Sequence, residues 1–125
     1  MTSIGNHMKF QVDLLHRDRV REFYVDLLGC TALPAPVPNV DLYLMPDGFV
    51  LGTFFVPPAE ALTLEQCLNA TWLEIMTPDP AALIARLMAF GVAPIDYSDK
   101  EHFYFHSPGG PVFRIAAASE RGPRP

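Results

Sequence analysis

Apolar and polar positions alternate near the N-terminus and predict a half-buried strand over Met8–Leu15. Phe10, Val12 and Leu14 share one face of this strand. The polar residues between them share the other face: Lys9, Gln11 and Asp13. The period then changes to that of an amphipathic helix over residues 17–28, with apolar side chains at i, i+3, i+4, i+7 and i+8. These are Val20, Phe23, Tyr24, Leu27 and Leu28.

Glycine and proline divide the rest of the chain into elements of strand or helix length. Further strands are predicted over residues 30–33, 41–45 and 49–56, and a short helix around 62–68. A second strand–helix pair follows at 71–77 and 79–90, where Asp79 is the expected N-cap and Pro80 the first helical residue. The helix presents four apolar residues to the core: Leu83, Ile84, Leu87 and Met88. Strands over 92–97, 102–106 and 112–117 complete the pattern, and the polar stretch Ser119–Pro125 predicts a flexible tail.

The two halves of the chain repeat one plan. Gly29 and Gly91, Pro46 and Pro108, and Gly48 and Gly110 are each 62 residues apart. Each half reads strand, helix, strand, strand, strand, so the sequence predicts an α+β fold built from two β-α-β-β-β units, about 8–57 and 71–118. Together they form one domain over residues 1–125.

Composition narrows the class of partner. The chain has 125 residues, of which half are hydrophobic and 18% charged, and a net charge of −5 without a basic stripe. We therefore expect no nucleic-acid partner. No apolar run approaches the roughly 20 residues of a membrane span, and no signal peptide is evident. The expectation is a cytoplasmic protein that does not associate with membranes.

Two motifs carry a resemblance to a known family. The first helix closes with Phe23-Tyr24-x-x-Leu27-Leu28-Gly29, and the last strand is preceded by Tyr104-Phe105-x-x-Pro108-x-Gly110. With the duplicated unit, these motifs resemble the vicinal oxygen chelate superfamily of glyoxalases, bleomycin-resistance proteins and extradiol dioxygenases. The resemblance implies a curled mixed sheet around a U-shaped cleft, a small-molecule ligand and a homodimer that completes two clefts.

In the metal enzymes of that superfamily, side chains on the first and last strands of each unit hold a divalent ion. Counting from the local motifs places these positions on Lys9, Gly52, Trp72 and Arg114. None of the four is a metal ligand. We therefore expect no metal and no cofactor. A metal-dependent lyase, isomerase or dioxygenase with His7 and Glu74 among its ligands remains the alternative.

One set of residues is assigned to the inferred cleft or its rim: Lys9, Gln11, Phe54, Trp72, Glu74, His102, Tyr104 and Arg114. One interpretation is a solvated polar face, with Arg114 paired to Glu74 or stacked on Trp72. The other is a pocket for a planar or partly anionic molecule, with Trp72 and Phe54 stacking on it. The second interpretation predicts a metal-independent protein, resembling bleomycin-resistance proteins, that sequesters an antibiotic-like or toxic compound.

Overall fold

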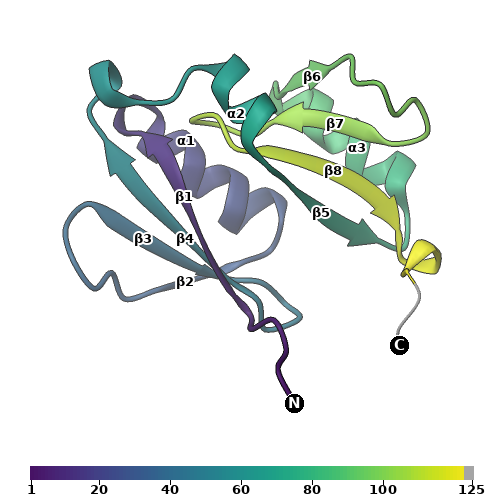
Figure 1. Ribbon diagram of the computed structural model, residues 1–125, viewed down its shortest axis with the longest axis horizontal. Coiled ribbons are helices and arrows are strands. Elements are labelled where there is room, and N and C mark those ends of the chain that lie inside the picture. The colour runs from purple at the N-terminus through teal and green to yellow at the C-terminus, as the bar shows by residue number, and fades with distance from the viewer. Residues whose placement is uncertain (123–125) are drawn as a thin grey trace.

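Each half of the chain folds into its own four-stranded mixed sheet in the computed structural model, which describes residues 1–122 (Figure 1). The first sheet has the order β1-β4-β3-β2 and the second the order β5-β8-β7-β6. In both, the first strand pairs parallel with the last, and the other pairs are antiparallel. The α+β class and the duplicated unit are thus confirmed.

The strands lie close to their predicted positions. The first sheet contains β1 (His7–Asp13), β2 (Thr31–Leu33), β3 (Val40–Leu44) and β4 (Val50–Val56). The second contains β5 (Trp72–Thr77), β6 (Ala93–Ile95), β7 (Phe103–His106) and β8 (Val112–Ala117).

The first long helix is interrupted by a change of pitch. A 3-10 turn, η1 (Leu14–His16), leads into α1 (Arg17–Arg21), which continues as the π-helical segment η2 (Glu22–Leu27). Gly29 follows with φ +77°, as the C-terminal glycine signal predicted. Leu14 belongs to η1 and is 44% exposed, so its predicted place on the buried face of the strand is wrong.

The second helix, α3 (Pro80–Phe90), begins as predicted. The carboxylate of Asp79 accepts a hydrogen bond from the Ala82 amide at 3.1 Å, Pro80 is the first helical residue, and Gly91 ends the helix with φ +98°. Leu83 and Leu87 are buried. Met88 is 49% exposed, so its assignment to the buried stripe is wrong. It is the last residue of that stripe and turns toward solvent.

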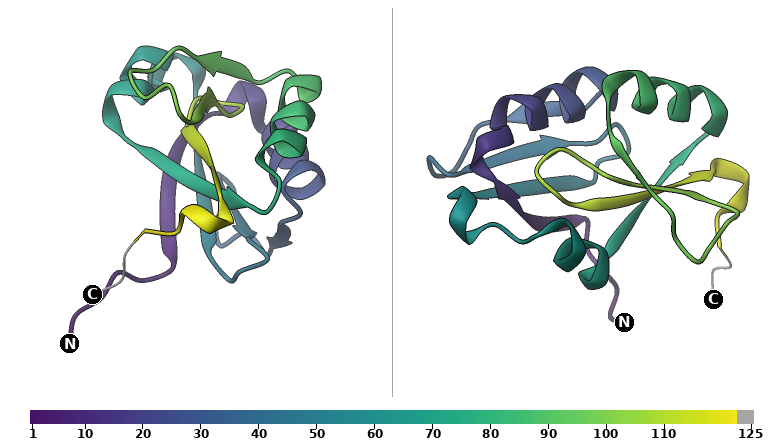
Figure 2. Two further views of the ribbon diagram at one scale, coloured as in Figure 1. Left: turned by 90° about the vertical axis from the view of Figure 1, so that its right-hand side faces the viewer. Right: turned by 90° about the horizontal axis from the view of Figure 1, so that it is seen from above.

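Both helical segments lie on the same side of the two sheets and share one hydrophobic core. Figure 2 (right) shows them along one edge of the molecule, with the sheets below them. The core combines residues of both units, among them Phe10, Phe23, Leu87 and Phe113. Arg86 in α3 donates a hydrogen bond to the Leu27 carbonyl at 2.9 Å and further joins the units.

The segment between the units crosses to the opposite side of the sheets (Figure 2, right). It contains η3 (Pro58–Glu60) and α2 (Leu64–Ala70), which begins with a capping box between Thr63 and Gln66. Cys67 of α2 packs with Tyr104 and Val112 in a small second core. The connector therefore covers part of the second sheet on the face away from α1 and α3.

The C-terminal stretch is more ordered than its composition predicted. Residues Ala118–Glu120 form a 3-10 turn, η4, in which Glu120 accepts a hydrogen bond from the Ala117 amide at 2.6 Å. The predicted flexible tail is wrong for this part, and residues 123–125 lie outside the described residues. No helix within residues 1–122 is long and apolar enough to span a bilayer.

Candidate functional site

The strand register revises one of the positions carried over from the metal enzymes. Lys9 pairs with Gly52 in the first sheet, and the residue that pairs with Arg114 in the second is Glu74. Glu74, two residues after the predicted Trp72, is therefore the counterpart of Lys9. Twenty residues separate Lys9 from Gly29 but only seventeen separate Glu74 from Gly91, and the first unit has the additional three-residue turn η1. Counting back from the glycines did not allow for that turn.

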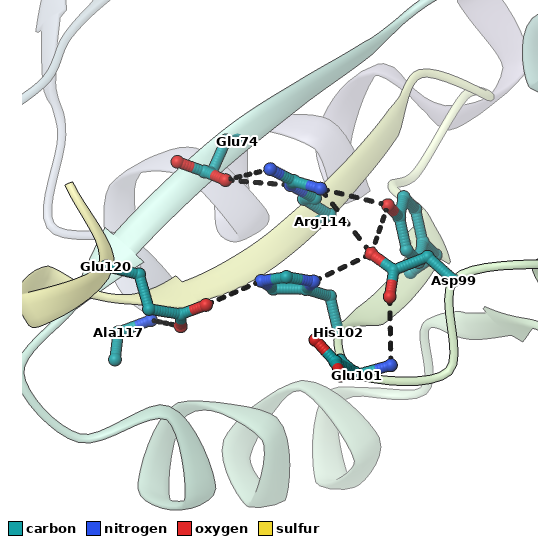
Figure 3. Close-up of polar contacts among 8 residues, drawn as sticks. Glu74, Asp99, Glu101, His102, Arg114, Ala117 and Glu120 are labelled. Atoms are coloured by element: carbon teal, nitrogen blue, oxygen red, sulfur yellow. Dashed lines mark hydrogen bonds and ion pairs between the residues drawn. The ribbon is translucent and has the colours of Figure 1, made fainter. Parts of the chain in front are cut away.

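Arg114 joins the polar side chains on this face of the second sheet (Figure 3). Its Nε donates to Glu74 Oε2 at 2.7 Å, and Nη2 lies 2.6 Å from the same oxygen. Its Nη1 donates to the Tyr104 hydroxyl at 3.2 Å and to Asp99 Oδ2 at 3.5 Å. The guanidinium carbon also lies 4.2 Å from the Trp72 ring centroid. Both arrangements that the sequence left open for Arg114, pairing with Glu74 and stacking on Trp72, are therefore present.

Asp99 is a second centre of the network, and sequence analysis had placed it in a simple turn. Its carboxylate accepts hydrogen bonds from the Glu101 amide at 2.9 Å and from the Tyr104 hydroxyl at 2.9 Å. His102 Nδ1 lies 2.7 Å from the same carboxylate. These donors, first the Glu101 amide, lower the pKa of Asp99 to about 2. The Asp99–x–x–His102 spacing is the one local signal that could have identified the pair.

His102 lies between two carboxylates. Its Nδ1 faces Asp99, and its Nε2 lies 2.7 Å from Glu120 Oε1 in η4. The hydrogen bond to Asp99, followed by that to Glu120, raises the pKa of His102. Glu120 was missed by sequence analysis because it lies 18 residues away in a stretch with the composition of a tail.

The aromatic residues of this face differ in accessibility. Trp72 is 37% exposed, and its ring meets Tyr104 edge-on at 5.9 Å between centroids. Tyr104 is 2% exposed and packs against Tyr97 at 4.4 Å. A ligand approaching from solvent would thus meet Trp72 first, while Tyr104 lies beneath the surface and orients the polar network.

The predicted residues of the first unit form a separate group. The Lys9 ammonium lies 5.3 Å from the centroid of Phe54, and the side-chain oxygen of Gln11 accepts a hydrogen bond from the Leu62 amide at 2.8 Å. Within residues 1–122, no hydrogen bond, ion pair or aromatic contact joins this group to Trp72 or Arg114. The structure therefore divides the predicted site into two clusters, one on each sheet.

A cavity of about 570 Å³ opens between the units on the helix side. Its walls come from the end of η2, the turn after β3, β5 and α3, and they are mainly apolar, as in Leu51, Leu73 and Leu83. Glu74 and Met76 reach its edge, and Ala118 and Arg121 line it beside η4. Sequence analysis did not identify this cavity, because it depends on how the two units are packed together.

The residues present do not fit a divalent metal of the family type. Of Lys9, Gly52, Glu74 and Arg114, only Glu74 has a side chain that ligates metals, and its carboxylate is bound by the Arg114 guanidinium. Among residues 1–122, no group of three or more His, Cys, Asp or Glu side chains lies close enough to hold a metal ion. A cation is already supplied to Glu74 by the protein itself.

Replacing Arg114 with glutamine is expected to lower the free energy of unfolding by about 1–3 kcal/mol. The change leaves Glu74 and Asp99, both under a third exposed, without their shared cation. Urea unfolding followed by circular dichroism measures the loss. Arg21→Gln is the control, because Arg21 has no ion pair in the described part of the chain and should change stability by less than about 0.5 kcal/mol. Equal losses would contradict the role given to Arg114.

No family model and no curated protein matches this chain. Solved structures do match over nearly all of it. The fosfomycin resistance protein FosX of Listeria monocytogenes superposes with a TM-score of 0.72 at 16% identity, covering 94% of this chain and 93% of FosX. The trypanothione-dependent glyoxalase I of Leishmania major gives 0.66 at 19% identity, covering 94% and 88%. TnmS3, an antibiotic-binding protein from Streptomyces sp. CB03234, gives 0.58 at 20% identity, covering 94% and 98%.

These neighbours establish the class of fold. The chain has the fold of the vicinal oxygen chelate superfamily, as its two motifs and its duplication predicted. At such low identity the likeness extends to the fold alone, and the neighbours themselves include both enzymes and an antibiotic-binding protein. Function must be inferred from this chain's own side chains.

Proposed function

We propose that the protein binds a planar small molecule without a metal ion and acts by stoichiometric capture of an antibiotic-like or toxic compound. The observation that carries the proposal is Arg114, which occupies a position given to a metal ligand in the enzymes and binds the Glu74 carboxylate from there. Beside it, Trp72 presents a partly exposed ring backed by the guanidinium. This arrangement suits stacking on a ligand and offers little to a metal-dependent reaction.

The charges around Trp72 refine the class of ligand. Glu74, Asp99 and Glu120 carry three negative charges, while Arg114 and a protonated His102 carry two positive ones. Each nitrogen of Arg114 also has an acceptor within the protein. The expected role of Arg114 as a donor to an anionic ligand is therefore replaced by a supporting one. A neutral or cationic aromatic ring fits this surface better than an anion does.

A homodimer would bring the two clusters together. Lys9, Gln11 and Phe54 lie on the first sheet, and Trp72 with Arg114 lies on the second. The resemblance implies that such clefts are completed by two chains, with the first unit of one facing the second unit of the other. β1 and β5 are edge strands of their sheets and would be the elements closest to such a joint. Sedimentation equilibrium should then give twice the mass of the chain.

Binding of a panel of aromatic antibiotics that includes bleomycin tests the proposed function. Trp72 is the single tryptophan of the chain, so its fluorescence should shift or be quenched by the compound that binds. For that compound, Trp72→Ala is expected to weaken the affinity measured by calorimetry about 10- to 100-fold. Trp72→Phe keeps an aromatic face and should lose less. Met88→Ala removes an exposed apolar side chain on the helix side and should leave the affinity unchanged.

Two results would contradict the proposal. One is a stoichiometric divalent ion, found by elemental analysis, in protein purified without chelator, because this would favour the metal-dependent alternative with His7 and Glu74. The other is a panel in which no compound changes the Trp72 fluorescence or binds by calorimetry. Circular dichroism of Trp72→Ala distinguishes loss of binding from loss of folding.

A further inference from the structure

Both ring nitrogens of His102 face carboxylate oxygens at hydrogen-bond distance. Nδ1 lies 2.7 Å from Asp99 Oδ2, and Nε2 lies 2.7 Å from Glu120 Oε1 (Figure 3). An ionised carboxylate can only accept hydrogen bonds, so both nitrogens must carry a proton. A neutral imidazole carries one proton and could satisfy only one of the two partners. The geometry therefore requires the imidazolium form.

The two carboxylates belong to different parts of the chain. Asp99 lies in the loop between β6 and β7, where it is also bound by Tyr104 and Arg114. Glu120 ends η4, and its other oxygen accepts the Ala117 amide. His102, with a side chain only 15% exposed, thus connects the C-terminal turn to a fixed network on the second sheet.

The same turn borders the cavity between the units. Ala118 begins η4 and Arg121 follows it, and both line the cavity of about 570 Å³. The residues on the opposite wall belong to the turn after β3, as in Pro46 and Asp47. The position of η4 consequently determines how far the cavity is closed at this end.

We propose that His102 is a pH-operated latch that holds η4 against the 99–102 loop and beside the cavity, and that loss of its second proton releases η4. This inference does not depend on the proposed ligand site, since it concerns the other end of β8 and needs no ligand. No covalent step is involved. The reaction is the loss of one proton from the imidazolium to solvent, which leaves one of the two carboxylates without a donor.

The sign of the pH dependence follows from all groups that face His102. They are Asp99 from the loop, Tyr104 from β7, Arg114 from β8 and Glu120 from η4. The pKa of His102 is raised, so its contribution is complete below the ordinary value of 6.5 and is lost as pH rises through the raised pKa. The pKa values of Asp99 and Glu120 are lowered from 3.8 and 4.5, so their contributions are lost as pH falls below this range. The latch is therefore closed between about pH 4.5 and 6.5 and opens in alkaline solution.

Nuclear magnetic resonance of the full chain labelled with ¹⁵N tests the latch. At pH 6 both ring nitrogens of His102 should be protonated, and their titration should be centred above pH 6.5. The backbone amides of residues 117–121 should shift with the same midpoint. Hydrogen exchange of the Ala117 amide, corrected for intrinsic pH dependence, should accelerate up to about tenfold per pH unit above that midpoint.

Glu120→Gln is the diagnostic variant, because it keeps the size of the side chain and removes one of the two charges. It should lower the His102 midpoint and abolish the linked shift of residues 117–121. Glu101→Gln removes a neighbouring charge whose side chain makes no hydrogen bond to His102 in the described structure, and it should preserve both effects. A singly protonated His102 at pH 6 would overturn the proposal. So would amides of residues 117–121 that do not follow the His102 titration in the unmodified protein.

Discussion

Replacing Phe113 with alanine is expected to lower the free energy of unfolding by about 3–5 kcal/mol, the range for removing a fully buried phenylalanine ring. Phe113 is 0% exposed and lies in β8 of the second unit. Its ring lies 5.7 Å from Phe10 and 6.0 Å from Phe23 in the first unit, and 5.9 Å from Phe105 in the second. The variant would therefore lose packing within one unit and between the two. Urea unfolding at equilibrium measures the change.

Phe54→Ala is the matched control for this prediction. Phe54 is also a phenylalanine in the last strand of its unit, but it lies on the other face, half-buried, with Lys9 over its ring. Its removal should cost less than half as much, because less apolar surface returns to water. Similar losses for the two variants would show that Phe113 does not hold the units together through the shared core.

The fold was predictable because its signals are local. Positive φ angles at Gly29, Gly48, Gly91 and Gly110 mark the same four points that the repeat of 62 residues identified. The change from a period of two to one of 3.6 located the strands and helices between them. Solvent exposure at the ends of elements was less predictable, as Leu14 and Met88 show, because an apolar residue at the end of a stripe has fewer neighbouring elements to cover it.

The candidate site was predictable only within each strand. Alternation correctly placed Glu74 and Arg114 on one face, and the structure pairs them. The three-residue turn η1 displaced the count along β5, because the repeat has one length through the helix end and another through the first strand. The contact between His102 and Glu120 joins a loop to a C-terminal turn, so no periodicity in the sequence records it.

The turn from Ser107 to Gly110 has a second role that its sequence does not reveal, and Gly109→Ala tests it. Gly109 has φ +83°, and a Cβ at this position would overlap Val12 Cγ1 of β1 in the other unit. The carbonyl of Gly109 also accepts a hydrogen bond from the Asp13 amide at 3.4 Å. We expect Gly109→Ala to lower the free energy of unfolding by about 2–4 kcal/mol, because backbone strain and steric overlap add.

Gly48→Ala separates these two causes. Gly48 has a similar φ of +93°, but a Cβ there meets nothing within 4 Å, so only the strain of about 1–2 kcal/mol should remain. The double variant Val12→Ala with Gly109→Ala should be more stable than the sum of the single changes predicts, because the smaller side chain relieves the overlap. Strict additivity, or equal losses at Gly48 and Gly109, would mean that the turn does not press on β1. The close contact would then not be the reason for a glycine at this joint between the two units.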